Sequence, residues 1–168
     1  MKSVRIRLMD RSRVSRNQAV RCLGRDVLLS SIMQEEKAFL HHGSVNCYDH
    51  SVSVAQMSLL LAQKLRVKVD AESLVRGALL HDLYLYDWHV SDPRHPHRLH
   101  GFFHPSRALQ NAERHFRLNS LERDIILRHM FPLTVLPPLC RESWLVCAAD
   151  TICAVQEWIH TRKGEKGP

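Results

Sequence analysis

Apolar residues recur with helical spacing from about residue 27 almost to the end of the chain, and this periodicity constrains the fold more than any other feature. No stretch shows the sustained alternation and β-branched enrichment that strands require. The pattern therefore predicts an all-α protein. The expected helices cover residues 27–40, 49–65, 71–86, 105–116, 121–130 and 141–159.

Helix boundaries carry their own signals. Asp70, with Ser73 three residues later, is a candidate N-cap, and Asn119 with Glu122 has the spacing of a capping box. Pro105 suits the first position of a helix. Residues 87–101 separate two helices and are expected to form a loop of the length that often carries function.

The composition places the chain among ordinary globular proteins. Its 168 residues are 45% hydrophobic and 24% charged, enough for one domain with a real core. No window has the roughly 18 uninterrupted apolar residues of a membrane span, and no secretory signal is visible, so we expect a cytoplasmic protein. The odd set of five cysteines, without a Cys-x-x-Cys pair, predicts reduced core thiols.

The positive charge is concentrated at the N-terminus. The net charge is +7, and residues 1–25 carry eight Lys and Arg against Asp10 alone. We therefore expect a flexible basic arm over 1–26, a helical domain over 27–160 and a polar tail over 161–168. Such an arm could touch nucleic acid or an anionic membrane, but the neutral body has no basic stripe to extend the contact, so a nucleic-acid partner is not expected.

Histidine is the exception in the composition, with 12 residues, several of them in apolar helical stretches. Taken singly, a histidine facing a core is usually hydrogen-bonded structure. An aspartate inside WLVCAADTICAV, however, would be an uncompensated buried charge without a cation or strong donors. Imidazoles and carboxylates are ligands that divalent metals accept, and six such groups could hold two ions. These groups are His50, His81, Asp82, His104, His129 and Asp150.

The order and local sequence of these groups resemble those of the HD-domain superfamily of metal-dependent phosphohydrolases. The matching segments, within about residues 40–155, are DHSVSVAQMSLLLAQKL, LVRGALLHDLYLYDW, HGFFHPSRALQNA, DIILRHMFPLT and LVCAADTICAV. The chain departs from the family pattern in having Leu83-Tyr84 after the His-Asp pair, where Ile-Gly is common. It also has Thr151 where close relatives are expected to carry a lysine.

The resemblance implies an α-helical bundle with a central metal site and an enzyme that cleaves a small nucleotide or related phosphoester. His50, His81, Asp82 and Asp150 would hold one ion. In the binuclear branch, which both extra histidines favour, His104 and His129 would hold a second ion, with Asp82 between the two. The resemblance leaves the metals open among Fe, Mn, Mg, Zn and Co, and it assigns His81 and Asp82 to catalysis.

Two alternatives share this ligand set. Mixed-valent di-iron oxygenases of the superfamily have the same order of histidines and aspartates, and sequence spacing does not separate them from hydrolases. A non-catalytic signalling module is the other alternative, although such a module has no physical need of all six ligands.

Other residues are candidates for contacts with a substrate. Arg107 and Arg128 could meet phosphate oxygens, because a guanidinium presents a bidentate fork. His100 is an alternative to His104 in the third motif, and His42 could line the pocket. The remaining histidines are divided between the loop, where they could line an entrance, and positions that we expect to be exposed. The loop histidines are His89, His95 and His97, and the expected exposed ones are His41, His115 and His160.

Overall fold

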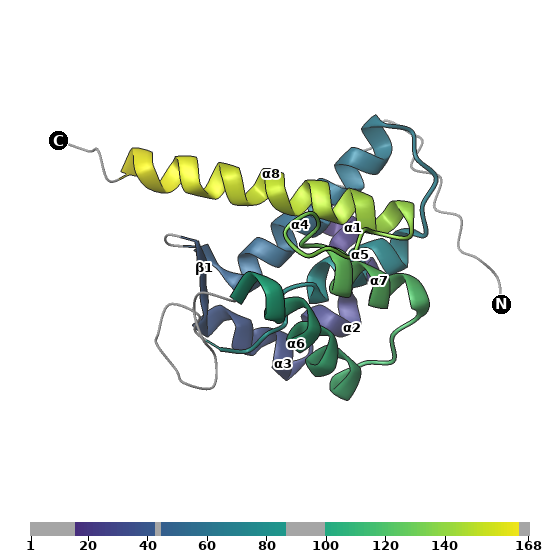
Figure 1. Ribbon diagram of the computed structural model, residues 1–168, viewed down its shortest axis with the longest axis horizontal. Helices are drawn as coiled ribbons and strands as arrows, with labels where there is room; N and C mark the ends of the chain where they lie inside the picture. The colour runs from purple at the N-terminus through teal and green to yellow at the C-terminus, as the bar shows by residue number, and fades with distance from the viewer. Residues whose placement is uncertain (1–15, 43–44, 87–99, 165–168) are drawn as a thin grey trace.

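The computed structural model describes residues 16–42, 45–86 and 100–164, and most of these residues are helical (Figure 1). The elements, in chain order, are α1 (Arg16–Leu23), α2 (Arg25–Leu28), α3 (Ser31–Glu35), the 3-10 helix η1 (Glu36–Ala38), β1 (Leu40–His42), β2 (Val45–Asn46), α4 (Cys47–Lys64), α5 (Ala71–Leu80), α6 (His100–His115), α7 (Ser120–Arg128) and α8 (Arg141–Gly164). The all-α prediction is confirmed. Within the described ranges, strand is limited to the antiparallel pair β1 and β2.

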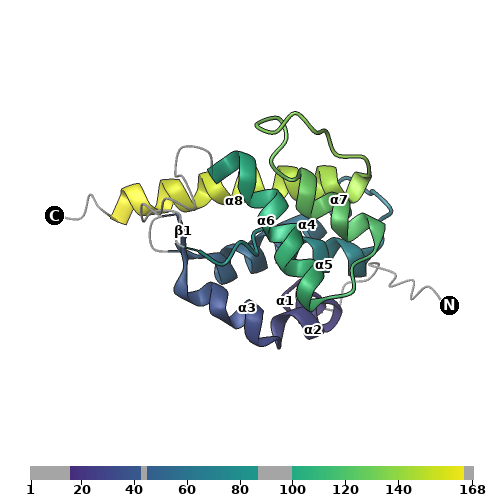
Figure 2. The same cartoon turned by 60° about the horizontal axis from the view of Figure 1, so that its bottom comes forward.

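The core lies where α4, α5, α7 and α8 pack together. Helix α4 contacts α5 and α8, and α5 contacts α7. Val54, Leu79, Ile125 and Val146 meet between these helices and are almost fully buried. Helix α8 crosses the bundle and extends beyond its edge toward the C-terminus in both views (Figures 1 and 2). The buried residues Val146, Ala149 and Cys153 mark the face of α8 that packs on the bundle.

The N-terminal third differs from the sequence prediction. A single helix over 27–40 was expected, but Ser30 is extended and its hydroxyl accepts a hydrogen bond from Met33 N, which starts α3 as a separate helix. The chain then becomes extended at Phe39 and enters β1. The prediction was wrong here because local side-chain bonds at Ser30 interrupt an otherwise helical apolar pattern.

Residues 16–26 also differ from the expected flexible arm. They form α1 and begin α2, and α1 packs against α4 and α5 through buried Val20. Gly24 allows this close approach, because a Cβ at that position would collide with the Leu79 side chain. The packing of its apolar residues against α4 and α5 therefore holds this segment in the fold, although the segment is rich in basic residues. Residues 1–15 and 165–168 lie outside the described residues.

The caps predicted for the middle helices are confirmed. The Asp70 side chain accepts from Ser73 N at 2.8 Å, and Asn119 and Glu122 form a reciprocal capping box. Helix α5 nevertheless ends at Leu80 rather than at residue 86. The chain turns there, and Leu85 adopts a positive φ of 58°. As a result, the His-Asp pair lies in a turn at the end of α5.

Two other helices are longer than predicted. Helix α6 begins at His100, so Pro105 lies inside the helix rather than at its first position, where its missing N–H removes one helical hydrogen bond. Helix α8 continues to Gly164 instead of ending near residue 160. The Arg162 guanidinium lies 3.8 Å from the centre of the Trp158 ring, a cation–π contact that supports this last part.

Two further predictions concern cysteines and membranes. All five cysteines are free thiols, as predicted, but only Cys47, Cys147 and Cys153 are buried in the core. Cys22 is exposed and Cys140 is partly exposed, so the prediction of core thiols was wrong for these two. Among the described helices, none is both long and apolar enough to cross a bilayer.

Candidate metal centre

Five elements each contribute one part of a polar cluster at the edge of the core. His50 lies on α4, the His81-Asp82 pair follows α5, and Asp150 lies on α8. His104 on α6 and His129 at the end of α7 complete the predicted set. The structure therefore brings together all six residues that the sequence singled out. Each of them is buried apart from Asp150, which is partly exposed.

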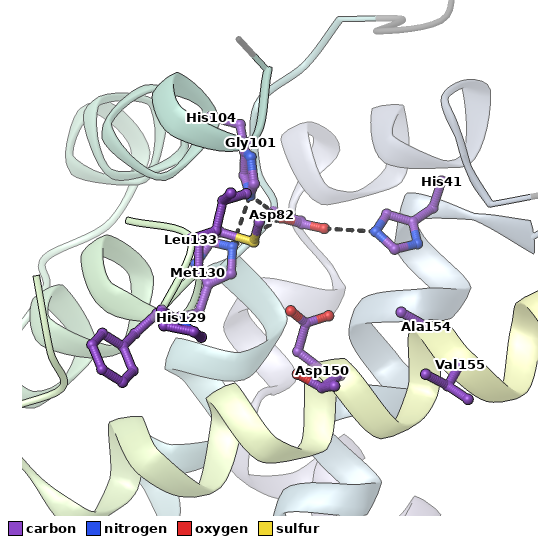
Figure 3. A pocket seen from close by; sticks show the side chains of 13 residues that line it. His41, Asp82, Gly101, His104, His129, Met130, Leu133, Asp150, Ala154 and Val155 are labelled. Atoms are coloured by element: carbon purple, nitrogen blue, oxygen red, sulfur yellow. Dashed lines mark hydrogen bonds and ion pairs between the residues drawn. The ribbon is translucent and has the colours of Figure 1, made fainter. Parts of the chain in front are cut away.

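Asp82 lies at the centre of this cluster (Figure 3). Its Oδ1 is 3.2 Å from His104 Nε2 and 3.5 Å from His129 Nε2. Its Oδ2 is 3.6 Å from His81 Nε2 and 4.0 Å from His50 Nε2. The two carboxylate oxygens thus face two different sets of imidazoles.

Asp150 closes the side of the cluster that faces α8. Its Oδ1 is 3.0 Å from His50 Nε2 and 3.8 Å from His81 Nε2. In Figure 3 its side chain points from α8 toward Asp82. His50, His81 and Asp150 therefore present two imidazole nitrogens and one carboxylate to the same small volume.

Backbone contacts fix which ring nitrogen of two histidines carries a proton. His81 Nδ1 lies 2.7 Å from Ala78 O, and His129 Nδ1 lies 2.8 Å from Ile126 O. A carbonyl oxygen only accepts, so each Nδ1 donates. In the neutral imidazole, Nε2 then carries a lone pair, and this lone pair is directed at the cluster.

These inward-facing atoms fit a divalent metal. His81 Nε2 and Asp82 Oδ1 are buried and have no hydrogen bond of acceptable geometry in the described part of the chain. Buried polar atoms are rarely left unsatisfied, and a group of lone pairs facing one another requires a positive charge between them. Nitrogen and oxygen donors of this kind suit borderline ions such as zinc, iron, manganese and cobalt.

The electrostatics lead to the same conclusion. Burial lowers the pKa of the His50 and His81 imidazoles, but the neighbouring carboxylates outweigh burial and raise the pKa of both to about 9. The imidazoles in turn hold the pKa of Asp82 and Asp150 well below the usual range, although burial opposes this. The cluster thus combines ionised carboxylates with imidazoles that attract positive charge.

Sequence reasoning missed two residues of this cluster. His41 on β1 was expected to be exposed, but it is only 9% exposed and its Nε2 lies 3.2 Å from Asp82 Oδ2. Glu157 on α8 contacts the Nδ1 atoms of both His41 and His50. The spacing of Glu157, seven residues after Asp150 on one helix, places both carboxylates on the same face and was an available signal. The position of His41 had no such signal, because it depends on the β1–β2 hairpin.

A pocket of about 380 Å³ opens beside the cluster. In Figure 3, Asp82 and Asp150 lie between apolar residues on two sides, Met130 and Leu133 on one and Ala154 and Val155 on the other. The polar lining residues are His41, Asp82, His104, His129, Asp150 and Thr151, and the rest of the lining is Gly101, Met130, Phe131, Pro132, Leu133, Ala154 and Val155. No Lys or Arg lines the pocket within the described ranges.

The two arginines predicted as substrate contacts do not line this pocket. Arg107 is exposed on α6. Arg128 is held away by Asp124, whose Oδ1 lies 2.7 Å from Nε, and by a hydrogen bond from Nη1 to Pro137 O. The side chains of His42 and His100, together with His89, His95 and His97 of the loop, lie outside the described residues.

A family model described as HD domain matches residues 47–155. No curated protein and no solved structure matches the chain. The matched segment starts at the beginning of α4 and ends within α8, so it includes every residue from His50 to Asp150 in the cluster. His41 and Glu157 lie just outside it, one at each end.

Proposed function

The chain belongs to the HD domain family, a superfamily of metal-dependent hydrolases, and from this premise we propose that it is a phosphohydrolase with a binuclear metal centre. The substrate would be a small nucleotide or related phosphoester. One observation carries the proposal: the two oxygens of Asp82 face two separate sets of imidazoles.

The two sets give each proposed ion its own ligands. His50, His81 and Asp150 surround one position, while His104 and His129, whose Nε2 atoms are 2.8 Å apart, lie at the other. Divalent ions held by these residues would lower the pKa of bound water toward about 7 and would so supply hydroxide at neutral pH.

The residues of the chain have distinct tasks in this proposal. Among the described residues, Asp82 is the carboxylate that contacts both sets, so it would hold the two positions at a set spacing. The backbone bonds of His81 and His129 hold the rings in one orientation, which limits reorganisation during the reaction. The apolar lining from Met130 to Leu133 would exclude water from one side of the substrate.

The test combines metal analysis with an activity screen. Protein purified without chelator should contain about two ions per chain and should hydrolyse at least one member of a panel of nucleotides and phosphomonoesters. Asp82→Asn should lose both ions, and its kcat/KM should fall by at least about a thousandfold. Asp49→Asn is the matched control, because Asp49 is exposed one residue before His50 and does not line the pocket.

Three outcomes would overturn the proposal. The binuclear centre fails if Asp82→Asn keeps the metal content of the wild type. The hydrolase assignment fails if the metal-loaded wild type cleaves no phosphoester in the panel. A coupled mixed-valent iron signal in electron paramagnetic resonance, together with dioxygen-dependent turnover, would establish the oxygenase alternative instead.

A further inference from the structure

His41 has an environment that closely parallels that of His50. The two rings stack with their centroids 3.6 Å apart and their planes 21° from parallel. His50 comes from α4 and His41 from the preceding strand β1, so the hairpin lays one imidazole over the other. Both rings lie at the polar edge of the core.

Glu157 contacts the Nδ1 atom of each of the two rings. Its Oε1 lies 2.9 Å from His50 Nδ1, and its Oε2 lies 3.3 Å from His41 Nδ1. Each oxygen of the Glu157 carboxylate is therefore used by one imidazole, and a carboxylate accepts hydrogen bonds, so both Nδ1 atoms donate to it.

The opposite ring nitrogens consequently present lone pairs in the neutral imidazoles. His50 Nε2 lies 3.0 Å from Asp150 Oδ1, and His41 Nε2 lies 3.2 Å from Asp82 Oδ2. A carboxylate behind each imidazole and a ligand carboxylate in front of it is the arrangement that orients metal-binding histidines in proteins. His41 has this arrangement as fully as His50 does, and it also lines the pocket.

We propose that His41 is a further Nε2 donor to a divalent cation at the Asp82 side of the metal centre, and that Glu157 is the positioning residue for His41 and His50 together. This proposal rests on the proposed metal centre. It adds a donor to that centre from outside the segment that the family model matches. The cation would belong to the borderline class that accepts imidazole, such as zinc or cobalt.

The first experiment needs no variant. In the apoprotein, long-range ¹H–¹⁵N correlation spectra should show His41 and His50 with Nδ1 protonated at high pH. Loading with Zn²⁺ should move both Nε2 resonances to the range of metal-bound imidazole nitrogen. A His41 Nε2 that keeps a proton in the loaded protein would show that it donates to Asp82, and the proposal would be overturned.

The second experiment measures affinity. His41→Gln should weaken binding of Co²⁺, measured by competition with a chelator, by at least about tenfold and should change the visible absorption of the bound Co²⁺. Glu157→Gln should weaken it by about 10-fold to 100-fold, with the metal-bound absorption shifted in the same direction. His160→Gln is the matched control, since His160 is an exposed histidine one turn beyond Glu157 on α8.

The comparison with Asp82→Asn separates this proposal from the proposed function. If Asp82→Asn retains both ions, the metal centre itself is wrong. If Asp82→Asn loses them while His41→Gln and Glu157→Gln match the control in affinity and absorption, the centre stands and only the role of His41 is refuted. Far-ultraviolet circular dichroism of each variant shows whether a loss of affinity comes from unfolding.

Discussion

Two pairs of histidines in the candidate metal centre are oriented by different means. His41 and His50 turn Nδ1 toward Glu157, a carboxylate more than a hundred residues away in sequence. His81, which shares a position with His50, and His129 of the other position turn Nδ1 toward backbone carbonyls three residues earlier in the chain. The first arrangement needs the finished tertiary fold, whereas the second is built within a single helix.

The difference also appears in charge. A carbonyl is a neutral dipole, so burial dominates at His129 and lowers its pKa below the ordinary 6.5. A carboxylate carries a full charge, and Asp150 and Glu157 together raise the pKa of His50 to about 9 despite burial. The carboxylates around a ring, rather than the group behind its Nδ1, therefore decide whether an imidazole attracts a proton at neutral pH. His81 also contacts a carbonyl, yet Asp82 and Asp150 raise its pKa to about 9.

Acidification should separate the two proposed ions, and this is the largest effect that we expect. An imidazole with a pKa of about 9 is protonated below that pH, so the ion held by His50 and His81 should lose at least about a thousandfold in affinity between pH 9 and pH 6. The ion that contacts His129 should lose less affinity over this range, because burial lowers the pKa of that imidazole below its ordinary value of 6.5. Two dissociation constants for Zn²⁺, measured across this range, test the comparison. Equal pH slopes for the two ions would contradict it.

Replacing Glu36 should show what a buried carboxyl does when it lacks the two histidines that Glu157 contacts. Burial and the charge of Asp82 raise the pKa of Glu36 to about 8, well above its unfolded value near 4.5. The folded state therefore binds a proton that the unfolded state releases, and the wild type loses stability as pH rises between these values. From pH 5 to pH 7, Glu36→Gln should gain about 2 to 3 kcal/mol relative to the wild type.

The measurement is urea unfolding of both metal-free proteins at several pH values. Glu35→Gln serves as the control, because Glu35 is the exposed neighbour of Glu36. A stability difference between Glu36→Gln and the wild type that stays constant with pH would mean that Glu36 is ionised in the folded protein.

The smallest effect is expected at the start of α7, the helix that ends beside His129. Asn119→Ala removes the capping box and should cost about 1 kcal/mol in unfolding free energy. Metal stoichiometry and affinity should remain within twofold of the wild type, because the Nδ1 contact of His129 is with Ile126 O at the other end of the helix. Asn119→Ser, which keeps an accepting oxygen, should recover most of the stability. A loss of metal in the alanine variant would show that the orientation of His129 also depends on the cap at the start of α7.

The same contrast explains what sequence reasoning found and what it missed. His81, His129 and Asp150 were recognisable because each interrupts an apolar helical pattern within a few residues. The helix caps at Asp70 and Asn119 were predictable for the same reason, since a cap depends on residues three positions apart.

Features that depend on distant contacts were not predictable in this way. His41 is placed by the β1–β2 hairpin, whose sequence shows no sustained alternation of apolar and polar residues. It is also oriented by Glu157, which lies on a helix near the other end of the chain. The helical segment over 16–26 was likewise hidden, because its basic composition favours solvent while Val20 and Gly24 pack against α4 and α5. Sequence patterns over a few residues predict each helix, but they do not predict which helices pack against one another.

The seven-residue interval between Asp150 and Glu157 makes the number of intervening residues more important than their identity. Seven residues turn an α-helix through about two full rotations, so both carboxylates share one face. One inserted residue would rotate Glu157 by about 100° away from the histidines and leave Asp150 in place. Substitutions within the interval change side chains only. A change in the length of the interval rotates Glu157 around the helix axis relative to Asp150. The number of residues between Asp150 and Glu157 therefore sets the orientation of one carboxylate relative to the other around α8.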